Sequence, residues 1–289
     1  TITVDDLLIS SAFLYELDET LAHYDLRSEV SRKIGYALAQ KYDRLVFRSL
    51  VRGAREDSPV SKTGFVEPGG TQIKVGTAAS TAAADAYDPS KLVNAFYDAA
   101  AAMDEKGVST DGRFGILNPR QYYELIQQVG ENGLVNRDAQ GTSRQKGNGI
   151  IEIAGIKIHK SMNIPFFGSY GTKYGTAGAT NPGVTDPGNT GTFVSETIED
   201  AENTDTGINN DYGANTNFVN TCGIIGQREG AGIVEAIGPQ VQVTKGDVSV
   251  IYQGDVILGR LACGADYVNP AACVELYAGV ATSSAPAAF

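Results

Sequence analysis

The sequence contains few of the residues on which most acid–base, nucleophilic and metal chemistry depends. Its 289 residues include two histidines, His23 and His159, and three cysteines, Cys222, Cys263 and Cys273. An odd, sparse set of cysteines argues against a disulfide framework, and without a Cys-x-x-Cys pair we expect no structural zinc site. Phosphate-loop, dinucleotide, nucleophile-elbow and zinc-protease motifs are also absent. The sequence therefore predicts no enzyme, no metal site and no cofactor.

Positive charge and long apolar runs are scarce as well. Lys and Arg number 23 against 34 Asp and Glu, which gives a net charge of −11. A protein that binds nucleic acid over its whole surface would have the opposite balance. No run of 18 apolar residues occurs, so we expect no membrane span and no membrane partner. The remaining composition, 42% hydrophobic and 20% charged, is typical of a globular protein.

The first 25 residues are acidic and lead into a long helical pattern. They hold six acids and no Lys or Arg, and their opening Thr-Ile-Thr-Val run predicts the end of a strand over 1–4. From Leu26 to about Arg52, apolar residues recur at steps of three and four, which predicts a helix roughly 40 Å long. Most of its circumference is apolar or small. We therefore expect the helix to be covered on more than one side, by its own domain and by a neighbouring subunit.

Six basic side chains of this helix fall into one stripe when residues are placed about 100° apart. The stripe consists of Lys33, Lys41, Arg44, Arg48, Arg52 and Arg55. These six residues are the candidate functional residues of the sequence, and they point to a binding surface rather than to catalysis.

Two further helices have clear start signals. Asp88 suits an N-cap with Pro89 in the first turn, and Gly107 suits the C-terminal cap. The predicted buried face of this helix consists of Leu92, Phe96, Ala99 and Met103. Asn118-Pro119 starts the second helix, where Gln121 is placed for a capping box.

Short strands account for much of the rest. They are predicted near Gln72–Val75 and Arg113–Leu117, and over 150–160 with Gly155 as a bulge. From Cys222 onward the chain is rich in strands, although 254–262 fits either a strand or a helix.

A long stretch over 165–221 differs in character from its surroundings. It holds nine Gly, eleven Thr and eight Asn, and its seven acids and one base give a net charge of −6. This composition predicts a solvated surface excursion of loops and short strands. Residues 136–147 begin like a calcium-binding loop but place Gly147 where a Glu is needed, so we predict no metal there. The acids of 196–211 are interpreted as a solubilising face.

Three segments of the sequence are similar to one protein family and occur in that family's order. They are TITVDDLLISSAFLYELDETLAHYDLRSEVSRKIGYALAQ within 1–55, LNPRQYYELI with IIEIAGIKIHKSMNIP within 112–165, and YQGDVILGRLACGADYVNPAACVEL over 252–276. Together they cover about half of the chain. The segments resemble the major capsid protein of tailed bacteriophages, in particular the short-tailed, cyanophage-like podovirus branch.

The resemblance implies an α+β fold, the tailed-phage major capsid fold, with a peripheral domain that carries a long spine helix and an axial domain. The resemblance also implies that the chain begins where the family's extended loop is already returning, so we expect the N-terminal arm and most of that loop to be missing from this sequence. The expected organisation is 1–25 for the returning loop and strand, 26–87 for the peripheral domain with the spine helix, 88–235 for the axial domain including the 165–221 excursion, 236–281 for the returning peripheral strands, and 282–289 for a disordered tail.

The function implied by the resemblance is self-assembly into hexamers and pentamers of an icosahedral shell around double-stranded DNA. The expected partners are other copies of the chain, a separate scaffolding protein, a portal protein and, through weak non-specific contact, packaged DNA. Assembly is expected in the host cytoplasm, and the expected location is the virion capsid. The alternative function is a phage or cell-surface adhesin, a binding module that uses the 165–221 excursion.

Several interpretations stay open at this point. The basic stripe could face packaged phosphate, pair with the acidic first 25 residues of a neighbour, or form a solvated helix face whose ion pairs contribute little. His159 fits an ordinary strand residue better than a pH switch. The cysteines fit buried small hydrophobic residues better than ligands or a disulfide.

Overall fold

A computed structural model describes most of the chain. The described residues are 2–4, 7–22, 25–58, 61–62, 65–77, 83–127, 151–161, 163–164, 221–243 and 253–279. His23, the candidate calcium loop, the 165–220 part of the acidic excursion and the predicted tail lie outside them. The chain divides into two compact units, the first formed by 1–46 and 232–266 and the second by 47–231 and 267–289.

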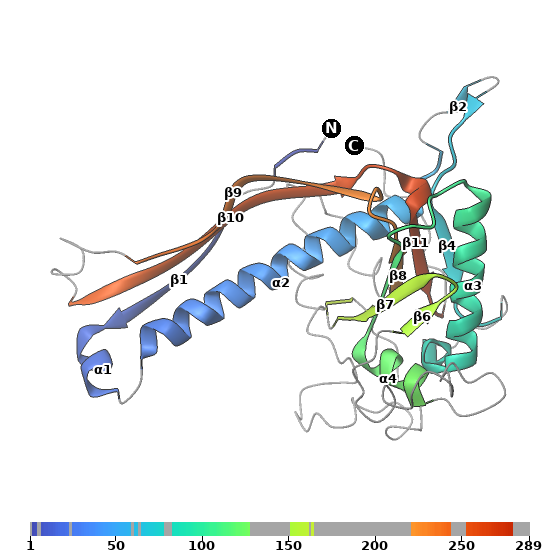
Figure 1. Cartoon of the computed structure of the whole chain (residues 1–289). Coiled ribbons are helices and arrows are strands. Elements are labelled where there is room, and N and C mark those ends of the chain that lie inside the picture. The colour runs from blue at the N-terminus through green and yellow to red at the C-terminus, as the bar shows by residue number, and fades with distance from the viewer. Residues whose placement is uncertain are drawn as a thin grey trace. The chain divides into compact units, whose positions relative to one another are not determined.

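The first unit is built on a sheet and the first part of a long helix (Figure 1). Its elements are β1 (Leu8–Tyr15), α1 (Glu16–Leu21), α2 (Leu26–Arg55), β9 (Ala231–Val243) and β10 (Gly254–Tyr267). Among the described residues, β10 lies in the middle of the sheet, between β1 and β9. The helix α2 contributes its residues up to Val46 to this unit.

Strand β1 pairs antiparallel with β10 over eight residues, from Leu8 opposite Leu261 to Tyr15 opposite Gly254. Because successive side chains of a strand point to opposite faces, half of β1 faces the helix and half faces away. The core under the helix consists of Ile34, Leu38, Leu45, Ile257, Leu261, Cys263 and Ala265. The strand predicted over 1–4 was wrong, since residues 2–4 have no strand structure. The strand forms instead in the uncharged run that can satisfy its backbone against β10.

The second unit contains a mixed sheet with helices. Its described elements are β2 (Ser61–Lys62), β3 (Phe65–Val66), β4 (Thr71–Lys74), η1 (Ala83–Tyr87), α3 (Pro89–Glu105), β5 (Phe114–Leu117), α4 (Pro119–Gln127), β6 (Ile151–Ile153), β7 (Ile156–Lys160), β8 (Thr221–Gly226), η4 (Pro270–Ala272) and β11 (Cys273–Tyr277). The sheet order is β4-β11-β8-β5-β7-β6, with β2 and β3 forming a separate pair. The β4–β11 and β5–β7 pairs are parallel and the other neighbours are antiparallel.

The helices of the second unit confirm their predicted caps. The Asp88 carboxylate accepts a hydrogen bond from the Ser90 backbone N–H at 3.0 Å, and Gly107 adopts a positive φ of 71° after the last turn of α3. The side-chain oxygen of Gln121 accepts from the Asn118 N–H at 3.0 Å, as the capping box requires. The predicted buried face of α3 is fully buried in a core that also includes residues of α4 and the sheet.

Two strand predictions are corrected or settled. The strand predicted over 150–160 is a hairpin, β6 and β7, and Gly155 is a turn residue rather than a bulge. Ala154 and Gly155 have φ values of 50° and 76°, the two positive angles of a tight hairpin turn. Residues 254–262, which fitted a strand or a helix, belong to β10.

The long helix is confirmed, and it extends to Arg55. Its burial on more than one side is confirmed for its last eight residues, 48–55, which are all buried. Earlier in α2, burial alternates with exposure, and side chains such as Tyr36 face outward. The predicted peripheral and axial domains are defined by their place in a capsomer, so their boundaries stay a prediction. No helix in the described part of the chain is long and apolar enough to cross a membrane.

Candidate functional site

The described residues contain no arrangement typical of catalysis. No group of three or more His, Cys, Asp or Glu side chains that could hold a metal ion occurs in this part of the chain. His159 lies exposed on β7 as an ordinary strand residue. The three cysteines are free and buried, as predicted. Burial raises the pKa of the Cys222 thiol, and it raises the pKa of Cys273 to about 12, so both thiols stay protonated near neutral pH.

The basic stripe divides between exposed and buried positions. Lys33 is exposed, Lys41 and Arg44 are half-buried, and the last three members are buried. A helical wheel gives the direction of each side chain around α2, but it does not show which residues pack against that side of the helix. The solvated-face interpretation is therefore wrong for Arg48, Arg52 and Arg55, which belong to the interior of the second unit.

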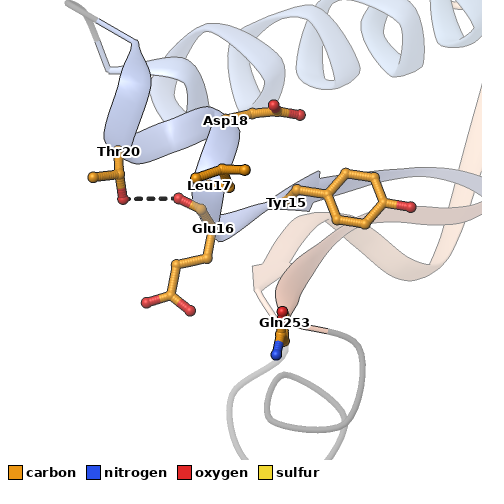
Figure 2. Close-up of a pocket in the computed structure, with 6 residues that line it drawn as sticks. All are labelled: Tyr15, Glu16, Leu17, Asp18, Thr20 and Gln253. Carbon is orange, nitrogen blue, oxygen red and sulfur yellow. Dashed lines mark hydrogen bonds between the residues drawn. The ribbon is translucent and has the colours of Figure 1, made fainter.

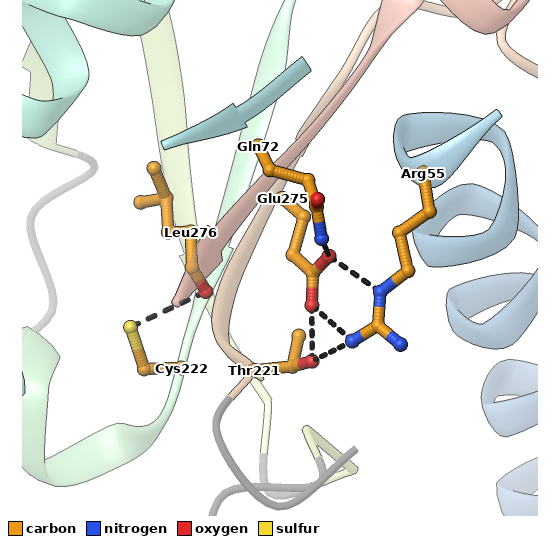
Figure 3. Close-up of polar contacts among 6 residues, drawn as sticks. All are labelled: Arg55, Gln72, Thr221, Cys222, Glu275 and Leu276. Carbon is orange, nitrogen blue, oxygen red and sulfur yellow. Dashed lines mark hydrogen bonds and ion pairs between the residues drawn. The ribbon is translucent and has the colours of Figure 1, made fainter. Parts of the chain in front are cut away.

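Arg55 belongs to a buried polar network centred on the Glu275 carboxylate (Figure 3). Its Nε donates to Glu275 Oε2 at 2.7 Å, and its Nη2 donates to Glu275 Oε1 at 2.5 Å. The side chains of Arg55 and Glu275 are 2% and 0% exposed. Thr221 Oγ1 donates to Glu275 Oε1 at 2.5 Å, and Gln72 Nε2 donates to Glu275 Oε2 at 2.8 Å. The network joins the end of α2 to β4, β8 and β11, so it fixes the fold and presents no surface to a partner.

Arg52 has a comparable internal role. Its guanidinium lies 5.4 Å from the centre of the Tyr267 ring, in cation–π range. The helix approaches closely here because residue 53 is glycine. A Cβ at that position would lie 2.8 Å from Tyr267 Cβ.

The exposed surface of the first unit is strongly apolar. Among the described residues, twelve of the fifteen exposed large apolar side chains belong to this unit. On the face of β1 opposite the helix lie Ile9, Phe13 and Tyr15, and the rings of Phe13 and Tyr15 are 4.8 Å apart, edge to face. We call these three residues the sheet patch. Val256 of β10 lies opposite Phe13 and is half-buried, which extends the apolar face across the strands.

A second apolar patch lies where β1 ends and α1 begins. Tyr15 is 57% exposed, and Leu17 and Leu21 are each 68% exposed. An open pocket of about 470 Å³ lies beside them, lined by Tyr15, Glu16, Leu17, Asp18, Thr20 and Gln253 (Figure 2). Thr20 Oγ1 donates to the Glu16 backbone carbonyl at 2.8 Å, and the carboxylates of Glu16 and Asp18 extend away from the backbone in different directions. The pocket holds no general base beside a nucleophile, and its apolar rim is suited to a contact with another protein.

These patches were not found from the sequence. In the sequence, the first 25 residues stand out for their acids. The overlooked signal is that Leu17 and Leu21 are four residues apart, which is the spacing of one helix face. The run LISSAFLY is apolar at both odd and even positions, so alternation could not show which half would be exposed.

The fold has the architecture of tailed-phage capsid proteins. The structure of the capsid of Cyanophage P-SCSP1u aligns with a TM-score of 0.69 and 29% identity, covering 96% of this chain and 73% of that chain. The mature capsid protein of bacteriophage PhiM1 aligns with a TM-score of 0.59 and 15% identity, over 96% of this chain and 72% of that chain, a likeness of fold. The predicted α+β tailed-phage major capsid fold is therefore confirmed.

The sequence comparisons agree. Residues 1–276 match the model of a family described as Gp10A-like major capsid protein. The major capsid protein of Escherichia phage T7 is 25% identical over 179 residues, which is 61% of this chain and 50% of that relative. The chain thus spans half the length of this relative. The chain belongs to the Gp10A-like major capsid protein family, and the resemblance recognised in its sequence is confirmed.

Proposed function

We propose that this chain is the shell-forming subunit of a phage capsid, and that its function is self-assembly into hexamers and pentamers of an icosahedral shell around double-stranded DNA. Family membership supports the proposal, and the observation that carries it is the exposed apolar surface of the first unit. A soluble monomer rarely leaves such a surface uncovered. Copies of the same chain that bury the sheet patch and the α1 patch gain roughly 25 cal/mol for each Å² of apolar surface removed from water.

The proposed mechanism requires no covalent step. Each contact between copies is weak by itself, and a closed shell repeats it many times, so small interface energies add up. We also propose a scaffolding protein and a portal protein as partners, because the family resemblance implies both.

The exposed or half-buried part of the basic stripe remains the candidate for contact with a neighbour or with DNA. Lys33, Lys41 and Arg44 are the residues concerned. The net charge of −11 makes extensive contact with DNA unfavourable, so we propose that phosphate contact is weak and that pairing with acids of a neighbour predominates.

The experiment that tests this function is assembly of the full chain. The chain is expressed with its scaffolding protein, and the products are separated by sedimentation and imaged by electron microscopy. Closed icosahedral particles hundreds of Å across are expected. A folded chain that stays a small, uniform species at high concentration would refute the proposal. Nothing in the similarities reported above favours the adhesin alternative. A folded chain that stays small and uniform would be the one result that favours it.

Two variants and a matched control link assembly to the apolar surface. Phe13→Ser and Tyr15→Ser remove exposed rings of the sheet patch, whereas Tyr97→Ser removes a comparably exposed ring from α3 of the second unit. The first two changes are expected to reduce the yield of particles while leaving the melting temperature almost unchanged. Equal losses in all three variants would show that the sheet patch has no special role.

A further inference from the structure

The apolar patch at α1 has charge on both sides. Leu17 and Leu21 stand one turn apart and share a helix face, since side chains at i and i+4 are neighbours. On α1, Glu16 and Asp18 lie about 100° to either side of Leu17, and both are exposed. We call Leu17 and Leu21 with these two flanking acids the tip patch. A partner that fits it needs an apolar or aromatic centre between two basic groups.

The outward face of α2 in the same unit has this composition. Tyr36 is 62% exposed, and Arg32 and Lys33, which precede it by four and three residues, are exposed on the same helix face. Ala39, three residues after Tyr36 on the same helix face, is small and exposed, so it leaves room for another helix to approach. We call Arg32, Lys33 and Tyr36 the helix patch.

We propose that the tip patch of one copy docks on the helix patch of a second copy, with the two leucines against the Tyr36 ring and the acids beside the two bases. This inference rests on the proposed function, because it names the contact through which copies associate. The order of groups is complementary, acid–apolar–acid against base–aromatic–base. In the matched register each acid lies beside a base and the leucines lie against the ring, whereas a shifted register places charged groups against apolar ones.

The charges of both patches are available for this contact. Arg32 Nη2 lies 2.8 Å from Glu29 Oε2, but those side chains are 76% and 46% exposed, and an exposed pair three residues apart contributes little. The tip and helix patches are different surfaces of the chain. A contact between them is therefore head-to-tail, and contacts of this kind generate rings when the rotation closes.

Cross-linking tests the contact directly. One preparation carries Leu17→Cys and another carries Tyr36→Cys, and the two are mixed under mild oxidation. The three native cysteines are buried, so they do not compete for disulfide formation. A disulfide-linked dimer containing one copy of each variant is expected. The matched control replaces Tyr36→Cys with Tyr97→Cys, which is 56% exposed on α3. Dimer formation no greater than in this control overturns the proposal.

Charge exchange tests the pairing in the assembled state. Glu16→Lys alone and Lys33→Glu alone are each expected to lower the particle yield about tenfold, because each places like charges together. The double variant restores opposite charges and is expected to recover to within about threefold of the unmodified chain. A double variant that loses as much as the two single losses combined overturns the pairing.

The two tests separate this inference from the proposed function. If the cross-linked dimer forms and the unmodified chain gives no shells, the contact stands and the shell function fails. If shells form and neither the cross-link nor the charge rescue is seen, the shell function stands and this contact is wrong.

Discussion

The two units of the chain place their apolar and charged side chains in opposite ways. The second unit takes charge into its interior, where Arg55 and Glu275 meet almost without exposure, and its described residues include three of the fifteen exposed large apolar side chains. In the described part of the first unit, Asp255 is the one buried charged residue, and Ile9, Phe13, Leu17 and other apolar side chains are exposed. The described core of the second unit is therefore closed by contacts within one chain. Under the proposed function, other copies cover the apolar surface of the first unit.

The largest loss of stability is expected when one partner of the buried Arg55–Glu275 pair is removed. Arg55→Met leaves the Glu275 carboxylate buried without its cation, and loss of one member of such a pair costs about 3–5 kcal/mol of stability. Denaturant unfolding measures the change. The double variant Arg55→Met with Glu275→Leu removes both charges and is expected to be more stable than the single variant. Similar stability in both would show that the carboxylate is not desolvated as described.

Two phenylalanine variants, one in each unit, test this difference between the units. Phe96 is fully buried on α3, and Phe96→Ala is expected to cost about 3–5 kcal/mol by leaving a cavity. Phe13 is 40% exposed on β1, and Phe13→Ser is expected to change stability by less than about 1 kcal/mol. Thermal unfolding measures both effects, and the particle yield is expected to fall for the Phe13 variant despite its normal stability.

A smaller effect is expected at the start of α3. Asp88→Ala removes the carboxylate that accepts from the Ser90 N–H, and loss of an N-cap costs about 1 kcal/mol. Asp88→Asn retains an acceptor and is expected to keep most of the stability. An Asn variant as unstable as the Ala variant would mean that the capping bond is not the source of the effect.

The smallest effect concerns Cys273. Because burial raises its pKa to about 12, the folded thiol is expected to resist alkylation near neutral pH and to react after unfolding. The raised pKa favours the protonated thiol in the folded state. Its contribution to stability is therefore complete below the usual thiol pKa and declines as the pH rises toward about 12. Unfolding midpoints at about pH 8 and about pH 10 should diverge more in the unmodified chain than in Cys273→Ala.

Much of the fold could be predicted from the sequence, because the signals were local. The period of α2 and the caps at Asp88 and Gln121 depend on residues two to four apart. The hairpin at Ala154-Gly155 was missed because Ala is rare at a turn position with positive φ. The candidate site was harder to predict from the sequence. Lys33 and Arg55 belong to one stripe in the sequence, and only tertiary packing exposes the first and buries the second.

The ladder between β1 and β10 has a consequence for how this protein can evolve. Both faces of β1 are largely apolar, so loss or gain of one residue within the strand would exchange Leu8, Ala12 and Leu14 for Ile9, Phe13 and Tyr15 beneath the helix. Such an insertion or deletion would retain a hydrophobic core and present a different set of side chains outside. A lineage could thereby change which neighbours its subunits recognise in one genetic step, while the fold itself is preserved.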